Sequence, residues 1–272
     1  MSLGSSEFEV LRVNRTGRTK VLDNIVAEAP LEIRVAGKPL VMTMRTPGDD
    51  DALAVGYLYS EGVILDRSDL LGTAPCRRVR EPGEAEAIDV FLSRPSRARA
   101  KGLKSRSVSN SSCGFCGKTS WLDQASVQFR HQPNFKVKSQ VLLGLSRTMQ
   151  KAQSGFNSTG GIHGAALFTR GGRMICLRED VGRHNAVDKV IGAKFLGSIP
   201  ECANPLLMVS GRVSYEIVTK ARMAQVRFIA AVSAPTSAAV ELARSADITL
   251  VGFLREDRFN VYSGWARIQF PP

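Results

Sequence analysis

Apolar and polar residues alternate with a period of two early in the chain and then change to helical spacing. Residues 31–46, "LEIRVAGKPLVMTMRT", alternate on both sides of a Gly-Lys-Pro sequence and predict a hairpin of two strands. Residues 47–62, "PGDDDALAVGYLYSEG", predict a helix, with Asp49 or Asp50 as its cap and Gly62 at its end. We expect this helix to pack on the sheet that contains the hairpin.

The next part of the chain has a weaker pattern. "AIDVFL", residues 87–92, predicts one more strand. "RPSRARAKGLKSR", residues 94–106, contains six basic residues without an apolar period, and we interpret it as a solvated, mobile linker. Residues 1–118 are therefore expected to form a small α+β, roll-like domain that ends in a loop with two cysteines.

Strand and helix patterns alternate regularly in the second half. We predict a hairpin at 165–179 that turns at Gly171 and Gly172, and strands at 205–211, 227–234 and 247–254. Helices are predicted at 185–197, 214–226 and 236–246. Asn185, Ser214 and Thr236 or Ser237 are the expected starts of these helices, and Gly197 is the expected end of the first. This alternation predicts adjacent parallel strands with helices on both faces. Residues 119–272 are expected to form a layered α/β domain whose ligand sits at the carboxyl ends of the strands.

The chain is strongly basic. Its 272 residues carry a formal net charge of +12, and 43% of them are hydrophobic, as in an ordinary globular protein. An anionic partner is expected, and it could be a nucleic acid, a phosphate-rich ligand or an acidic protein. A nucleic-acid module is disfavoured because aromatic residues do not interleave with the basic ones. Apolar runs are far shorter than the roughly 20 residues that cross a bilayer, and the start lacks a secretory pattern, so we expect a soluble cytoplasmic protein.

Two of the five cysteines, Cys113 and Cys116, form a C-x-x-C pair in "SNSSCGFCGKTSW". The odd number of cysteines favours free thiols over a disulfide framework. A structural zinc site needs four ligands, and the sequence offers no second pair at metal spacing. The zinc-deaminase signature is missing too, since Gly164 and Ala165 follow His163, and Ser112 stands where the motif has proline. We therefore expect no tightly held metal.

Thiol–disulfide exchange and sulfur carriage are the other uses of such a pair. A thioredoxin-like pair follows a strand and opens a helix, whereas here the preceding residues are basic and polar. A sulfur carrier needs an accessible thiolate in a loop that can move. Basic neighbours such as Arg106 and Lys118 stabilise a thiolate or a persulfide, and glycines leave the sulfur unshielded. The residues leave the three uses open and favour the third.

Several turns in the second half suit an anion. Gly160, Gly161 and His163 precede a predicted strand, where paired glycines allow close approach of a ligand or simply make a turn. Ser210 and Arg212 lie at the start of a predicted helix, where free N–H groups favour negative charge. Both turns are candidate phosphate contacts.

"CLREDVGRHNAVDKVIG" is denser in polar groups. Its strand-to-helix turn contains Glu179, Asp180, Arg183, His184 and Asn185. These residues fit an anion site at a helix N-terminus, and they fit a network of caps and salt bridges equally well.

The last predicted strand ends in an aromatic residue beside two arginines. Phe253, Arg255 and Arg258 suit a purine stacked on a ring with its diphosphate held by guanidinium groups. An ordinary dinucleotide or ATP site is not expected, because no G-x-G-x-x-G or Walker sequence occurs.

The order of "SSCGFCG", "TGGIHGAALF", "EDVGRHNAVDKVIG" and "SGRVSYEIVTKA" resembles the formate dehydrogenase accessory sulfurtransferases, the FdhD family. The resemblance implies an enzyme that takes sulfur from a cysteine desulfurase as a persulfide on Cys113, helped by Cys116. It delivers the sulfur to the molybdenum or tungsten of a bis(molybdopterin guanine dinucleotide) cofactor, bound as a substrate and destined for formate dehydrogenase.

The resemblance also implies a homodimer and a second domain with the three-layer fold of cytidine deaminases. The cofactor contact of the family maps onto Phe253, Leu254, Arg255, Glu256, Asp257 and Arg258. This sequence has Glu256 and Asp257 where members of the family tend to have Lys and Gly.

Overall fold

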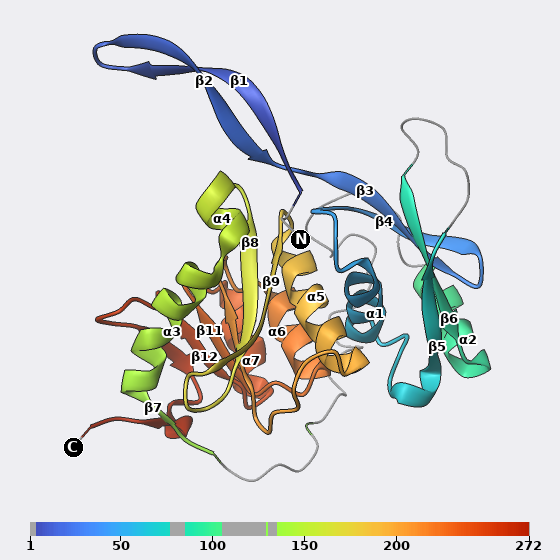
Figure 1. Cartoon of the computed structure of the whole chain (residues 1–272). Helices are drawn as coiled ribbons and strands as arrows, with labels where there is room; N and C mark the ends of the chain where they lie inside the picture. The colour runs from blue at the N-terminus through green and yellow to red at the C-terminus, as the bar shows by residue number, and fades with distance from the viewer. Residues whose placement is uncertain (1–3, 77–84, 105–128, 130–134, 272) are drawn as a thin grey trace.

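The computed structural model describes residues 4–76, 85–104, 129 and 135–271 (Figure 1). The described part of the chain forms a four-stranded sheet with two helices, a six-stranded sheet between two helical layers, and two sheets of two strands each, one of which is a projecting ribbon. No helix in these ranges combines the length and the apolar composition that crossing a bilayer requires.

The ribbon consists of β1 (Ser5–Asn14) and β2 (Gly17–Val26), which pair in antiparallel register. It projects away from the body of the molecule, and β2 continues into the first strand of the four-stranded sheet (Figure 1). These two strands were not predicted from the sequence.

The four-stranded sheet has the order β4-β3-β6-β5. Its elements are β3 (Ala29–Val35), β4 (Lys38–Arg45), α1 (Asp50–Ser60), the short helix η1 (Arg67–Asp69), β5 (Leu70–Pro75), β6 (Glu86–Leu92) and α2 (Arg94–Lys104). The predicted hairpin, helix and later strand are confirmed by β3–β4, α1 and β6. Apolar residues of the strands pack with α1 and α2 in one core.

The interpretation of the basic segment as a linker is wrong for residues 94–104, which form α2. Ser96 and Ala100 are buried one helical turn apart, so the segment has an inward face that its many arginines conceal in the sequence. Arg99 also turns inward, where its guanidinium donates to the Asp69 carboxylate and to the Val63 carbonyl. The ion pair between Arg99 and the buried Asp69 helps to fix this segment as a helix, although its many charges had suggested a solvated linker.

The six-stranded sheet has the order β13-β12-β11-β10-β8-β9. Its strands are β8 (His163–Phe168), β9 (Met174–Asp180), β10 (Leu206–Val209), β11 (Phe228–Ala231), β12 (Thr249–Gly252) and β13 (Asn260–Ser263). As predicted, β10, β11 and β12 are parallel neighbours. The β8–β9 hairpin pairs antiparallel with β10 and extends the sheet on one side.

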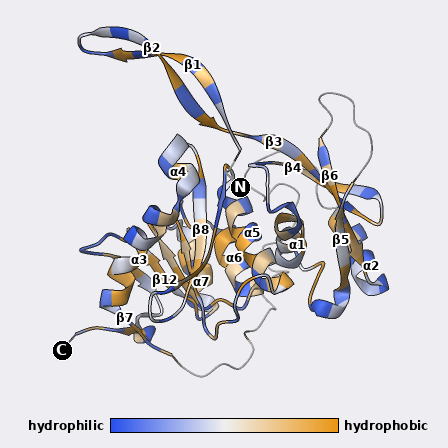
Figure 2. Cartoon of the chain, in the orientation of Figure 1, coloured by the Kyte–Doolittle hydropathy of each residue, from blue (hydrophilic) through white to orange (hydrophobic). Residues whose placement is uncertain are grey.

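Helices cover both faces of this sheet, as predicted. One face packs on α5 (Arg183–Leu196), α6 (Tyr215–Met223) and α7 (Ser237–Ser245). The other packs on α3 (Ser139–Ala152), beside which lie β7 (Val137–Lys138), α4 (Ser154–Thr159), the short helix η2 (Trp265–Arg267) and β14 (Ile268–Gln269). Figure 2 shows hydrophobic colouring on the central strands, α5 and α6. The likeness to cytidine deaminases stays a prediction.

The two sheets are joined by direct contact of α1 with α5. A Cβ placed on Gly56 would lie 1.9 Å from the Asp188 carbonyl oxygen, and one on Gly192 would lie 1.8 Å from the Ala52 carbonyl oxygen. The helix backbones therefore touch where each helix has a glycine. Beside this contact the buried Lys220 ammonium lies 2.8 Å from both carboxylate oxygens of Asp188.

The predicted helix caps are correct in part. The Thr236 hydroxyl accepts from the Ala239 N–H, as a capping residue does. Asp49 occupies the cap position of α1 but makes no capping bond, and its carboxylate instead lies 3.1 Å from Arg178 Nε. The prediction of Asn185 as a cap is wrong, because α5 begins two residues earlier, at Arg183.

Candidate functional site

Most of the predicted contact residues gather at one edge of the six-stranded sheet. The parallel strands β10, β11 and β12 end there, at Val209, Ala231 and Gly252. The β8–β9 hairpin runs the other way, so His163 at the start of β8 and Asp180 at the end of β9 are paired at this same edge. We call this region the carboxyl edge; it is the position at which open α/β sheets bind their ligands.

Backbone hydrogen bonds connect the loops that follow the three parallel strands. The Val213 N–H donates to the Ala234 carbonyl at 3.1 Å, and the Thr236 N–H donates back to the Val213 carbonyl at 2.9 Å. The Phe253 N–H donates to the Ser233 carbonyl at 3.1 Å. The three loops therefore form one continuous backbone surface.

His163, Arg183 and Gly211 meet at the centre of the carboxyl edge. A Cβ on Gly211 would lie 3.4 Å from His163 Nδ1 and 3.6 Å from the Arg183 Cβ, so Gly211 leaves room between the two side chains. Arg183 Nε is buried without a hydrogen-bond partner among the described residues. A buried guanidinium nitrogen of this kind is an available donor for an anion.

The surroundings of His163 favour the neutral form of its imidazole. Burial lowers the pKa of His163 below the ordinary 6.5, and the positive charges of Arg183 and His184 lower it further against the opposing effect of Asp180. A neutral imidazole can both donate and accept a hydrogen bond.

Stability should consequently depend on pH through His163. The unfolded chain gains a proton as the pH falls below about 6.5, while the folded chain resists protonation until its lowered pKa is reached. This contribution is present above pH 6.5 and is lost as the pH falls through the folded pKa. Between about pH 7 and pH 5, we expect the melting temperature of His163→Gln to fall less than that of the parent chain. Equal losses, measured by calorimetry, would exclude this role.

His184 contacts residues at the start of α6. Its Nε2 lies 2.9 Å from Glu216 Oε2 and 3.2 Å from the Ser214 hydroxyl. The second carboxylate oxygen of Glu216 is buried without a hydrogen-bond partner in the described ranges. Sequence analysis did not identify Glu216, because a glutamate in the first turn of a helix is the ordinary complement of the helix dipole.

The small residues of the carboxyl edge have separate positions. The Ser210 hydroxyl accepts from the Gly164 N–H at 3.0 Å, and the Ser210 N–H donates to the Gly164 carbonyl, so Ser210 ties β10 to β8. Gly160 ends α4 with φ 67°, a left-handed conformation that favours glycine. A Cβ on Gly161 would lie 3.3 Å from Val26 of the ribbon. Arg212 is exposed.

The turn at 253–258 follows β12 and combines buried and exposed groups. Phe253 is 42% exposed and has φ 52°, whereas the Leu254 side chain is fully buried in the core. Arg255 donates through Nη1 to the Val232 carbonyl at 2.7 Å. Arg258 Nη1 lies 3.1 Å from Asp257. The turn therefore presents an aromatic face and two guanidinium groups to solvent.

Glu256, the other carboxylate of this turn, is partly neutralised by an ion pair with a residue of α3 that was not predicted from the sequence. Glu256 lies 3.5 Å from Arg147 of α3, and both side chains are exposed. The ion pair reduces the repulsion that Glu256 exerts on an anion at the turn, although exposed pairs contribute little energy.

Two of the crowded polar residues, Glu179 and Asp180, are structural. Glu179 accepts from the Gly155 and Phe156 N–H groups at 2.9 Å and so satisfies the start of α4. Asp180 Oδ2 lies 2.8 Å from Lys189 Nζ, and both residues are buried. Lys189 also donates to the Thr46 carbonyl at 2.8 Å. For these groups the capping and ion-pair interpretation is correct.

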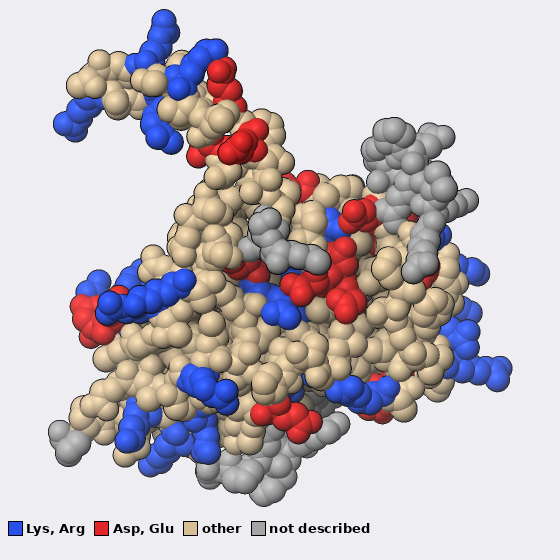
Figure 3. Space-filling model, in the orientation of Figure 1, with Lys and Arg blue, Asp and Glu red and all other residues tan. Residues whose placement is uncertain are grey.

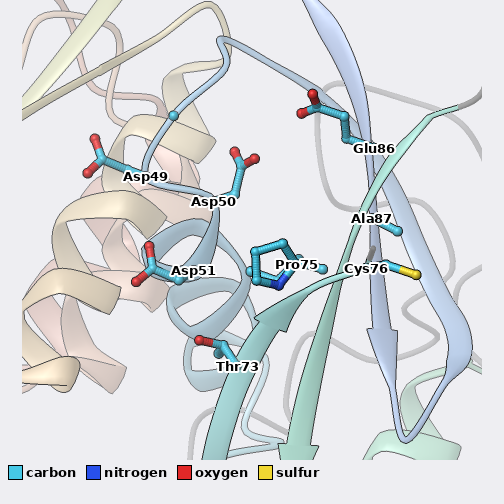
Figure 4. A pocket seen from close by; sticks show the side chains of 10 residues that line it. Asp49, Asp50, Asp51, Thr73, Pro75, Cys76, Glu86 and Ala87 are labelled. Atoms are coloured by element: carbon cyan, nitrogen blue, oxygen red, sulfur yellow. The ribbon is translucent and has the colours of Figure 1, made fainter. Parts of the chain in front are cut away.

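A separate pocket of ≈ 630 Å³ lies between α1 and the β5–β6 strands, and it is acidic. Its lining residues are Gly48, Asp49, Asp50, Asp51, Thr73, Pro75, Cys76, Glu86, Ala87 and Ile88. Figure 4 shows the three aspartates on one wall and Glu86 and Cys76 on the other. Two arginines offset part of this charge: the wholly buried Arg45 binds Asp50 and Glu86, and Arg178 Nε lies 3.1 Å from Asp49. An anionic ligand is therefore better accommodated at the carboxyl edge.

Comparisons with known proteins show the family of the chain. A sequence model of the FdhD/NarQ family matches residues 26–269, which is most of the chain. The chain belongs to the FdhD/NarQ family. It is 43% identical over 266 residues to a protein of Streptomyces coelicolor named sulfur carrier protein FdhD, with 96% of this chain and 94% of that protein aligned. A protein of the same name from Saccharolobus solfataricus is 38% identical over 271 residues, with 98% and 100% aligned.

A solved structure has the same fold as this FdhD/NarQ chain. The crystal structure of a protein described as a formate dehydrogenase accessory protein, from Desulfotalea psychrophila, superposes with a TM-score of 0.76 at 22% identity. The superposition covers 97% of this chain and 99% of that one. The likeness extends over both sheets, because coverage is nearly complete.

The predicted sulfur-carrying residues of the FdhD/NarQ chain, Cys113 and Cys116, lie outside the described residues, as do Arg106 and Lys118. The last described helix before them, α2, ends at Lys104. The roles of these cysteines therefore stay a prediction from the sequence.

Proposed function

We propose that the chain is a sulfur carrier that accepts sulfur on Cys113 from a cysteine desulfurase and delivers it to the guanine-dinucleotide molybdenum or tungsten cofactor of formate dehydrogenase. The observation that carries the proposal is the nearly full-length similarity to sulfur carrier proteins at 43% identity. The C-x-x-C sequence and the basic composition supply the chemical groups that this role needs.

Sulfur enters by exchange between a thiolate and a persulfide. The Cys113 thiolate attacks the outer sulfur of the donor persulfide, a new S–S bond forms on Cys113, and the donor cysteine leaves as a thiolate. The reaction needs no oxidant or reductant. Basic residues on either side of the pair favour the thiolate by stabilising its negative charge. A cysteine desulfurase supplied with cysteine should therefore load Cys113 with sulfur.

The residues of the carboxyl edge fit an anionic cofactor that arrives as a substrate. Arg183 offers a buried Nε without a partner in the described chain, and Gly211 leaves space beside it. Phe253 offers an exposed ring, and Arg258 an exposed guanidinium group. Phosphate oxygens suit the guanidinium groups and a guanine suits the ring. When bound, the cofactor supplies the metal that receives the sulfur.

Guanosine diphosphate should therefore protect the folded chain against heat. A ligand at 100 times its dissociation constant stabilises the native state by about 2.7 kcal/mol, so the melting temperature should rise clearly. Arg183→Gln should lose most of this protection, and Arg94→Gln, an exposed change on α2, should keep it. Differential scanning fluorimetry measures both.

Two results would oppose the cofactor part of the proposal. One is indifference of the parent chain to guanosine diphosphate together with tight, salt-sensitive binding to unrelated RNA, which would favour a nucleic-acid module. The other is full protection of Arg183→Gln, which would move the binding site away from the carboxyl edge.

A further inference from the structure

Trp265 is the most exposed large apolar side chain in the described part of the chain, at 71%. Tryptophan is usually largely buried, so this exposure suggests a surface that is covered by a partner. A pocket of ≈ 280 Å³ lies beside it, and its lining includes Trp265, Arg244, Asp247 and Tyr262. The pocket is smaller than the roughly 300 to 1,000 Å³ that small ligands occupy, so it suits one inserted side chain of a protein.

This pocket lies at the end of the six-stranded sheet opposite the carboxyl edge, which we call the amino edge. Asp247 and Ile248 of the pocket precede β12, whereas Phe253 follows it. In Figure 1 the start of β8 lies at the end of the sheet nearer the ribbon, and the C-terminus of the chain lies toward the other end. A protein bound over Trp265 therefore leaves the carboxyl edge accessible to the cofactor.

Positive charge prevails around the pocket. Arg244 lines it and is exposed. The one carboxylate among its described lining residues, that of Asp247, is bound by Arg267 and lies 3.9 Å from Arg227 Nη1. Two guanidinium groups therefore offset Asp247, and the charge of Arg244 is left to attract an anionic group of a partner.

Two lysines extend this charge along the same surface. β14 follows η2, which contains Trp265, and pairs with β7. Lys138 of β7 and the neighbouring Lys136 are both exposed. Figure 3 shows mainly basic residues over the end of the body that carries β7 and the C-terminus. We call Trp265 with its pocket, Arg244, Lys136 and Lys138 the Trp265 surface; its charge complements an acidic protein surface.

The segment that contains the cysteine pair joins the described chain at this edge of the sheet. Phe129 is the first described residue after Cys116, and Arg227 Cζ lies 4.6 Å from the centre of its ring. Arg227 precedes β11 and lies next to Asp247 of the pocket. A protein bound over Trp265 is therefore close to the point at which the chain returns from Cys113.

We propose that the Trp265 surface is the docking surface for the sulfur donor, and that the cysteine desulfurase contacts it with an acidic patch that carries an apolar side chain. That side chain and Trp265 form the buried centre of the interface, and Arg244, Lys136 and Lys138 form its polar rim. This inference rests on the proposed function, because it assigns the surface through which the donor reaches Cys113. Donor and guanine nucleotide then bind at opposite ends of the sheet.

The initial rate of sulfur gain at a series of chain concentrations, with a fixed catalytic amount of cysteine desulfurase and excess cysteine, tests this docking surface. Trp265→Ala and Arg244→Glu should each raise the KM for the chain about tenfold or more and leave kcat unchanged, because they remove contacts and not the acceptor sulfur. Leu71→Ala is the matched control, since Leu71 is 70% exposed on β5 of the other sheet, and its KM should equal that of the parent chain. Guanosine diphosphate should protect all three variants against heat as it protects the parent chain.

An unchanged KM for Trp265→Ala, or an equal rise for Leu71→Ala, would overturn the docking surface and leave the proposed function in place. A difference between the sedimenting masses of Trp265→Ala and the parent chain would also overturn it, because a second copy would then be what covers the surface. If the parent chain gains no sulfur at any concentration, the proposed function fails, and the docking surface fails with it. Melting temperatures equal to that of the parent chain show that the variants are folded.

Discussion

Gly192→Ala is expected to lower the free energy of unfolding by about 3 kcal/mol or more. The new Cβ would stand 1.8 Å from the Ala52 carbonyl oxygen, and that atom belongs to the backbone of α1. Overpacking a close contact costs about 1 to 3 kcal/mol, and more where rigid backbone must move. Alanine recovers roughly 1 kcal/mol of helix propensity, which is too little to compensate. The helices must separate, so the α1–α5 junction between the two sheets loosens.

Gly144→Ala is the matched control, since it makes the same substitution within a helix. Gly144 lies in α3, is exposed, and has no atom within 4 Å of its Cβ position outside its own helix backbone. This variant should gain about 0.5 to 1 kcal/mol. Urea unfolding followed by circular dichroism measures both changes. Stabilisation of Gly192→Ala to the same degree as Gly144→Ala would show that α1 and α5 are not in backbone contact.

Strands and helices with regular apolar spacing could be predicted from the sequence. The β3–β4 hairpin, α1 and the parallel series β10, β11 and β12 all have the expected positions. Burial explains these patterns, because β3 buries alternate residues in one core, whereas β10, β11 and β12 are buried on both faces and therefore have continuous apolar runs.

Elements whose stability comes from other parts of the chain could not be predicted. The α2 helix carries many basic residues, and its inward face depends on Asp69, a residue 30 positions from Arg99. The β1–β2 ribbon has apolar residues on both faces, and its large apolar side chains are exposed instead of packed in a core. The local sequence pattern shows neither the ion pair of α2 nor the exposure of the ribbon.

The position of the candidate site could be predicted from the sequence, whereas the roles of several of its residues could not. Strand alternation identified the carboxyl edge, and helix N-termini identified Arg183 and Ser210 as residues near it. The roles of Glu179 and Asp180 depend on Gly155 and Lys189, whose positions are fixed only by the folded chain. The contact of Gly211 with His163 likewise requires two strands to be neighbours.

Cys113→Ala is expected to abolish sulfur acceptance. The new S–S bond of the proposed reaction forms on this sulfur, and alanine has no atom that can replace it. Cys116→Ala should still accept sulfur if Cys113 is the primary acceptor, and it serves as the matched control. Melting temperatures of both variants should equal that of the parent chain.

The intact mass of the chain after incubation with a cysteine desulfurase and cysteine tests the central claim most directly. We expect the parent chain and Cys116→Ala to gain the mass of sulfur, and Cys113→Ala to gain none. A reducing agent should remove the added mass, as expected of a persulfide. If the parent chain instead loses only two hydrogens, forming a disulfide between its paired cysteines without gaining sulfur, the chain is a thiol–disulfide exchange protein and the sulfur-carrier account is contradicted.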